Sequence, residues 1–123
     1  MKKFQFLPHT ADIKIRVYGK NIEEIINNSL LALSSYLKPK LTKQKIERKI
    51  KLKAETAEDL IDFLSQVLAR IHIDKAIFIK FKQGKIRGYK FSELSKDIKA
   101  ITYHQTQLKK TNNRYIFDFI IDI

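Results

Sequence analysis

Apolar and polar residues recur with two different periods along this chain, and each change of period marks an expected element. Strict alternation over residues 12–18 is typical of a half-buried strand. Apolar positions three or four residues apart then predict a helix that begins after Asn21, which can act as its N-cap. A second helix is expected after Thr56, where Asp59 completes a capping box, and its apolar face extends to Ile71.

The other alternating segments are expected to be strands. One precedes the second helix and four follow it: residues 45–54, 76–81, 85–91, 98–108 and 114–121. The order is therefore strand, helix, strand, helix and then several strands in succession. This order predicts an α+β fold, with a single domain over residues 1–123 in which a mixed or antiparallel β-sheet packs against two α-helices.

Composition narrows the class of protein. A chain of 123 residues can bury a core, and 44% hydrophobic residues is ordinary for a globular protein. There is no cysteine, which excludes a disulfide scaffold, a thiolate zinc site and a cysteine nucleophile. No apolar run approaches the ~20 residues of a membrane span, and the segment before Pro8 is too polar for a secretory signal. We therefore expect a cytoplasmic protein without a membrane partner.

The net charge of +12, from 25 basic and 13 acidic residues, points to an acidic partner such as RNA. However, most of the basic residues are lysines and the favoured apolar residue is isoleucine, a bias that an AT-rich coding sequence produces on its own. RNA recognition also favours arginine and exposed aromatic rings. Charge alone therefore leaves both explanations open.

Most familiar enzyme classes lack their signature in this chain. The three glycines are not clustered, so no phosphate-binding loop is present. The three histidines, His9, His72 and His104, are too far apart in sequence to suggest a zinc site. No serine lies in the context of a nucleophile elbow. A stand-alone metal-dependent phosphohydrolase is also disfavoured, because no general base or phosphate clamp is evident.

Three carboxylates have unusual settings. Asp12 stands at the start of the first alternating strand, and Asp122 lies in a very hydrophobic segment beside the α-carboxylate of Ile123. Two adjacent anions require a compensating cation or full solvation. If Asp12 lies across a sheet from them, three hard oxygen donors could bind Ca²⁺, Mg²⁺ or Mn²⁺; the alternative is solvated acids and a turn cap. Asp118 shares a strand face with Asp122, but ~13 Å separate them, so one ion cannot bind both.

Lys99 also has apolar neighbours, within residues 98–104. It is expected to share a strand face with Ile101 and Tyr103, while His104 lies on the opposite face, packed or at the rim. Lys99 can be an ordinary solvent-facing lysine, or a cation close to the carboxylates or to the phosphates of a partner.

Five segments, taken in order, resemble those of the archease family. The resemblance spans essentially the whole chain, and the first, fourth and last segments are the most specific. The segments are FLPHTADI at residues 6–13, YGKNIEE at 18–24, EDLIDFL at 58–64, IKAITYH at 98–104 and IIDI at 120–123.

The resemblance implies an accessory protein rather than an enzyme. Archeases assist the RtcB-type RNA ligase of tRNA splicing and RNA repair, promoting its GTP-dependent guanylylation and its multiple turnover. In the family a divalent cation, assigned as Ca²⁺ with Mn²⁺ or Mg²⁺ as alternatives, is held by residues that correspond to Asp12, Asp122 and Ile123. The lysine that matters for activation corresponds to Lys99. His9 belongs to the same N-terminal motif as Asp12 and is expected to contribute to activation or to contact with the partner.

This chain departs from the family pattern at three places. Pro8 stands where many members have an aspartate, Gln66 replaces an acidic residue of the second helix, and residues 85–97 form a shortened segment. These departures concern any further acidic ligand and the surface that meets the partner. They leave Asp12, Asp122 and Lys99 unchanged.

The alternative function is a basic module that binds structured RNA without activating a ligase. It rests on the net charge and predicts an affinity that falls steeply with salt. The two functions are compatible, because a basic surface can contact tRNA indirectly or weakly while the carboxylate-bearing end meets the ligase.

Overall fold

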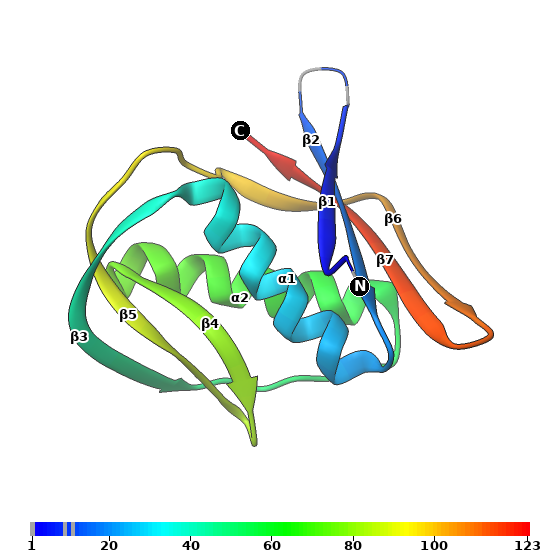
Figure 1. Cartoon of the computed structure of the whole chain (residues 1–123), viewed down its shortest axis with the longest axis horizontal. Coiled ribbons are helices and arrows are strands. Elements are labelled where there is room, and N and C mark those ends of the chain that lie inside the picture. Colours follow the sequence, from blue (N-terminus) through cyan, green and yellow to red (C-terminus); the bar gives the residue numbers. More distant parts are fainter. Residues whose placement is uncertain (1, 9, 11) are drawn as a thin grey trace.

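Two helices join two separate antiparallel sheets in a computed structural model that describes residues 2–8, 10 and 12–123 (Figure 1). The first sheet has the strand order β1-β2-β7-β6, and the second has the order β3-β5-β4. The predicted α+β class is confirmed, but the chain divides its strands between two sheets rather than one. The elements are β1 (Phe4–Leu7), β2 (Ile13–Gly19), α1 (Ile22–Leu37), β3 (Pro39–Lys49), α2 (Ala57–Asp74), β4 (Ala76–Lys82), β5 (Lys85–Leu94), β6 (Ala100–Thr111) and β7 (Arg114–Asp122).

Both helices begin where the capping residues predicted. The side chain of Asn21 accepts a hydrogen bond from the Glu24 amide at 2.9 Å. Thr56 Oγ1 accepts from the Asp59 amide at 3.1 Å, and the Asp59 carboxylate accepts in turn from the Thr56 amide at 3.1 Å. The Asp59 carboxylate also accepts from the Glu55 amide, and these hydrogen bonds hold the pKa of Asp59 below its usual value.

The helix ends carry no comparable sequence signal. Both helices are closed by lysines in the left-handed region, Lys38 with φ of 48° and Lys75 with φ of 51°, where glycine is the usual residue. The end of α1 is stabilised by a segment distant in sequence. Ser95 and Lys96 donate their amides to the carbonyl of Leu37 at 3.2 and 3.3 Å, so the connection from β5 to β6 caps α1.

One hydrophobic core joins the two sheets through the helices. Helix α1 contacts β2 and β4, while α2 contacts β6 and β4. Each helix therefore buries its apolar face against both sheets at once, which fixes the position of the first sheet and of the two chain segments that meet at its end. The largest fully buried side chains are Phe63, Phe78, Phe117, Phe119, Ile15, Ile25, Leu30, Leu33, Leu37, Ile61, Leu64 and Ile71.

Strand β6 contains a large bulge that the sequence did not predict. Thr102 pairs with Ile120 and Gln107 pairs with Asp118, so five steps along β6 match two along β7. The three extra residues break the regular alternation, and Gln105 adopts a left-handed φ of 55°. The strand expected over 98–108 is present as β6, Ala100–Thr111, but the bulge interrupts its ladder with β7.

The consequences of this bulge appear in the faces of the segment. Ile101 is buried, whereas Tyr103 is 56% exposed, so these two residues do not share an environment. Lys99 precedes the strand and is exposed, and His104 is exposed rather than packed. Alternation predicts faces only while two paired strands advance one residue for one, and β6 and β7 do not do so across this bulge.

Two strands also differ from the prediction. Strand β1 was not expected from its short apolar segment. The strand expected over 45–54 lies earlier, at Pro39–Lys49. Its last pair is Lys49 with Lys85, the residue at which its partner β5 begins after the turn at Gln83 and Gly84. Residues beyond Lys49 have no neighbouring strand to continue the ladder, which ends β3 there.

Glycine at position 88 permits the close approach of β4 and β5. A Cβ atom placed on Gly88 would lie 1.7 Å from the carbonyl oxygen of Ile77, a backbone atom that cannot rotate away. We expect Gly88→Ala to lower the free energy of unfolding by about 2–3 kcal/mol, as overpacking of a filled site does. Urea denaturation measures this, with Gly84→Asn as a control at a turn where the left-handed φ of 75° is open to asparagine. Equal stability of Gly88→Ala and the natural chain would contradict the prediction.

No helix among the described residues is long and apolar enough to cross a membrane.

Candidate functional site at the end of the four-stranded sheet

The pairing of β2 with β7 brings Asp12 next to the C-terminal residues. Ile13 lies opposite Ile121 in this antiparallel ladder, so the preceding residue, Asp12, faces the following residue, Asp122. Ile13 and Ile121 both belong to the core side of the sheet, which places Asp12 and Asp122 on the opposite, outer face. Asp12 is partly exposed and Asp122 is exposed. The two carboxylates that the sequence singled out are thus neighbours across one edge of the sheet.

Lys99 is anchored to the same edge from the other side of β7. Its amide donates a hydrogen bond to the carbonyl of Asp122 at 2.8 Å, just before the Ala100–Asp122 pair opens β6. Ile123 follows directly and is 38% exposed. Three separate parts of the chain therefore contribute Asp12, Lys99, Asp122 and Ile123 to one sheet end. His9, the other residue expected to serve a partner, lies outside the described residues.

The donor types at this edge suit a hard divalent cation. Asp12 and Asp122 supply carboxylate oxygens, and the α-carboxylate of Ile123 is the third expected donor. Over residues 2–8, 10 and 12–123, no three His, Cys, Asp or Glu side chains come together as a metal cluster. The expected set contains only two such side chains, so it is a mixed set of side-chain and main-chain oxygens. All three donors reach solvent, where water can complete a coordination shell.

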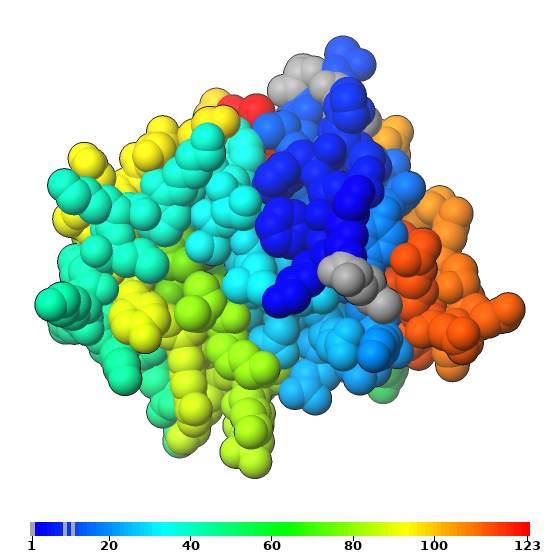
Figure 2. All heavy atoms as spheres, viewed as in Figure 1, coloured from blue at the N-terminus to red at the C-terminus, as the bar shows by residue number. Residues whose placement is uncertain are grey.

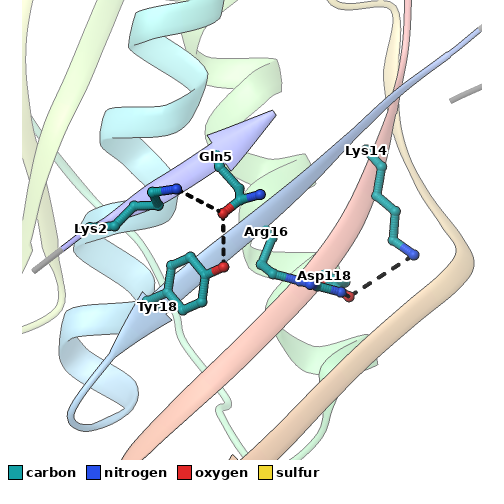
Figure 3. Close-up of polar contacts among 6 residues, drawn as sticks. All are labelled: Lys2, Gln5, Lys14, Arg16, Tyr18 and Asp118. Carbon is teal, nitrogen blue, oxygen red and sulfur yellow. Dashed lines mark hydrogen bonds and ion pairs between the residues drawn. The ribbon is translucent and has the colours of Figure 1, made fainter. Parts of the chain in front are cut away.

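Asp118 is excluded from this edge by its own ion pair (Figure 3). It is 4% exposed, and its two carboxylate oxygens accept from Nε and Nη2 of Arg16 at 2.8 and 2.9 Å. Lys14 Nζ lies 4.0 Å from the same carboxylate. The hydrogen bond with Asp118 raises the pKa of Arg16, which stays charged. The carboxylate that the sequence offered as a rival of Asp122 is therefore neutralised within the sheet.

These flanking cations were missed in the sequence, although a signal was present. Lys14 and Arg16 alternate with buried residues along β2, so both point to the outer face, as Asp12 does just before the strand. A buried aspartate in the apolar β7 segment needs a cation from a neighbouring strand. Combining these two facts would have paired Arg16 with Asp118 once the β2–β7 register was known.

A second group of polar contacts links β1 to β2, its neighbour in the same sheet (Figure 3). The Tyr18 hydroxyl donates to Gln5 Oε1 at 2.9 Å, and Lys2 Nζ donates to the same oxygen at 3.2 Å. The guanidinium of Arg114 lies over the Tyr18 ring, 5.0 Å from its centroid. These contacts hold the strand that leads into the N-terminal motif against β2.

The bulge of β6 is tied to α2 by Tyr103, whose hydroxyl donates a hydrogen bond to the Asp62 carboxylate. This hydrogen bond raises the pKa of Tyr103, because ionising the phenol would break it and place two anions side by side. The contact joins the segment that contains Lys99 to a helix of the core. Neither residue was expected to contact the other, because they are 41 positions apart in sequence.

The fold defines a small α+β protein in which Asp12, Lys99, Asp122 and Ile123 lie at one accessible sheet edge. The chain matches the model of the Archease protein family (MTH1598/TM1083) over residues 4–123, and it belongs to that family. It is 32% identical over 144 residues to the protein archease of Methanosarcina mazei, covering 99% of this chain and 97% of that protein. It is 33% identical over 139 residues to the protein archease of Saccharolobus islandicus, covering 100% of both.

Solved structures with the same fold include two relatives of lower identity. A crystal structure of an archease from Thermotoga maritima, named as a possible chaperone, aligns with a TM-score of 0.81 and 21% identity over 95% of this chain and 94% of that one. The solution structure of a Methanobacterium thermoautotrophicum protein aligns with a TM-score of 0.72 and 22% identity, covering 100% of both chains. These alignments confirm the fold.

Proposed function

We propose that this protein is an activator of an RtcB-type tRNA-splicing RNA ligase, and not a ligase itself. It promotes GTP-dependent guanylylation of the ligase and multiple turnover in tRNA splicing and RNA repair, in the cytoplasm. Membership of the archease family supports the proposal. The observation that carries it is the β2–β7 register, because this register gathers Asp12 and Asp122 at one accessible edge beside Lys99.

In this proposal Asp12, Asp122 and the Ile123 carboxylate hold one divalent cation, Ca²⁺ or alternatively Mn²⁺ or Mg²⁺. A cation bound there supplies a positive charge that can bind oxygen ligands of the partner. The chain's own residues keep the donors in place. The ladder between β2 and β7 fixes the spacing of Asp12 and Asp122, and the Asp12 amide donates to the Thr10 carbonyl at 2.8 Å.

Lys99 has a separate role in this proposal. Its main chain is fixed by the hydrogen bond to Asp122, while its side chain is exposed and free to extend toward a partner. A lysine ammonium is a compact charge suited to a phosphate or a carboxylate. We infer that Lys99 contacts anionic groups near the guanylylation site of the ligase, and that His9 of the same motif contributes to that surface.

Single-turnover guanylylation of the cognate ligase tests the proposal. Purified ligase is mixed with radiolabelled GTP and Mn²⁺, with and without this protein, and the covalent ligase–GMP adduct is followed over time. We expect faster adduct formation, and repeated ligation by each ligase molecule in a multiple-turnover assay. Lysozyme, another basic protein, controls for non-specific effects of positive charge. Identical time courses with and without this protein would contradict the proposal.

A further inference from the structure

The second sheet carries an unusual concentration of positive charge on one face. In β3 and β5 the residues Ile46 and Ile86 are buried, so the residues that alternate with them point to the opposite, outer face. Pairing across the three strands arranges these outward residues in rows. The face formed by these rows, called the basic face below, consists of Lys45, Glu47, Lys49, Lys80, Lys82, Lys85, Arg87 and Tyr89.

The last row of the basic face consists of lysines alone. Lys49 of β3 pairs with Lys85 of β5, and Lys85 pairs with Lys82 of β4. The central Lys85 therefore has a lysine directly opposite it on each neighbouring strand. Residues so paired have Cβ atoms about 4.5–5.5 Å apart, and like charges at this spacing destabilise a sheet. An anion bound across the row would remove this repulsion.

The one acidic residue of the basic face is already neutralised. Glu47 accepts from Arg87 Nε at 2.6 Å and lies 3.6 Å from Lys85 Nζ. The hydrogen bond from Arg87 keeps the pKa of Glu47 below its usual value, so this carboxylate stays ionised. Six cations and one anion leave a strong positive surplus on the basic face, and Lys49 and Lys82 are exposed.

An aromatic ring lies within this charged surface. Tyr89 is partly exposed and pairs with Lys45 across β3 and β5. It lines a shallow hollow of about 480 Å³ together with Lys45, Lys80 and Arg87. A positively charged groove that contains an aromatic ring is the combination that binds single-stranded nucleic acid, with phosphates on the cations and a base stacked on the ring.

We propose that the basic face binds single-stranded RNA. The charge and Tyr89 argue for a single-stranded nucleic acid, while the choice of RNA over DNA rests on the proposed ligase function. An anionic membrane is disfavoured, because none of the large apolar side chains that the described part of the chain exposes belongs to the basic face. An acidic protein would not require the stacking ring.

The basic face and the carboxylate edge lie apart, so both can be occupied together. In the view of Figure 1 the turn between β4 and β5 is at the bottom, whereas the C-terminus is at the top. Figure 2 shows the same separation in the space-filling view, with the red C-terminal residues at the top and the yellow-green turn between β4 and β5 at the bottom. One protein could thus hold RNA while its carboxylate edge contacts the ligase.

Fluorescence anisotropy without any ligase tests the inference, so that its outcome is independent of ligase activation. The probe is a fluorescein-labelled 12-nucleotide single-stranded RNA, titrated between 0.05 and 0.5 M salt. The triple variant Lys49→Gln, Lys82→Gln, Lys85→Gln removes the lysine row. Its matched control, Lys96→Gln, Lys109→Gln, Lys110→Gln, removes the same charge from exposed positions outside the second sheet.

We expect the face variant to reduce the slope of log affinity against log salt by about 2, because each of its three lost cations contributes about 0.7 to that slope. If the curves converge near 1 M salt, this corresponds to about 100-fold weaker binding at 0.1 M, while the control stays close to the natural chain. Tyr89→Leu should weaken binding about tenfold through loss of stacking, and Tyr89→Phe should not. The face variant should remain folded by circular dichroism, because its repulsive row is gone and Glu47 keeps Arg87.

Several results would overturn the inference. Equal loss of affinity in the face variant and its control would show diffuse attraction rather than a site. Unchanged binding by Tyr89→Leu, together with equal affinity for a duplex RNA, would exclude single-strand recognition. Tighter binding of the matching single-stranded DNA would exclude the choice of RNA. Binding to phosphatidylserine vesicles or polyglutamate without binding to RNA would assign the basic face to another partner.

Discussion

Asp122→Asn should bring guanylylation of the ligase back to the rate measured without this protein. The substitution keeps the shape of the side chain but removes one of the two side-chain carboxylates at the β2–β7 edge. Affinity at oxygen-ligand sites changes over decades with the number of charged ligands, so Ca²⁺ affinity should fall at least about tenfold. Asp12→Asn should have the same effect. The adduct assay measures the first outcome, and isothermal titration with Ca²⁺ measures the second.

Matched variants separate this effect from a general loss of charge. Glu58→Gln removes one negative charge from an exposed position in the first turn of α2 and should leave stimulation unchanged. A peptide extension after Ile123 converts its carboxylate to an amide and should reduce stimulation, whereas the same extension before Met1 should reduce it less. Full stimulation by Asp122→Asn, with unaltered Ca²⁺ binding, would contradict the proposed cation site.

Arg16→Met should lower the free energy of unfolding by about 3 kcal/mol, because it leaves the buried Asp118 carboxylate without its bidentate partner. Removing one member of a buried ion pair costs about 3–5 kcal/mol, and the lower end applies here because Arg16 is partly exposed and Lys14 remains 4.0 Å away. Chemical denaturation of the purified variant measures the change. Since Asp118 lies two pairs from the candidate site on the same face, ligase stimulation should also weaken.

A double variant and a second ion pair provide the controls. Arg16→Met with Asp118→Leu replaces the whole pair by apolar groups and should recover most of the stability. Arg48→Met should cost less, because Asp74 keeps a second arginine, Arg70, at 3.2 Å. Equal destabilisation by Arg16→Met and Arg48→Met would contradict the claim that Asp118 depends on Arg16 more than Asp74 depends on Arg48.

The candidate site was largely accessible from local sequence. Asp12 and Asp122 stand out because a carboxylate beside an apolar strand must be solvated, paired or bound to a cation. Lys99 stands out in the same way, and the motifs around these residues resemble one family along the whole chain. The sequence did not contain the distance between these residues. That distance depends on which strands are neighbours, and nothing local to residues 12 or 122 specifies that β2 pairs with β7.

The sequence by itself determined the α+β class and both helix starts, because these depend on periodicity and capping. It also singled out Asp12, Asp122 and Lys99 as candidate site residues, because a charge in an apolar environment is costly. Only the tertiary structure decided that the strands form two sheets, that β3 stops opposite Lys85, the first residue of its partner β5, and that β6 bulges after Thr102. These features depend on contacts between residues far apart in the chain. The same long-range pairing placed three lysines in one row, and Asp12 and Asp122 at one edge.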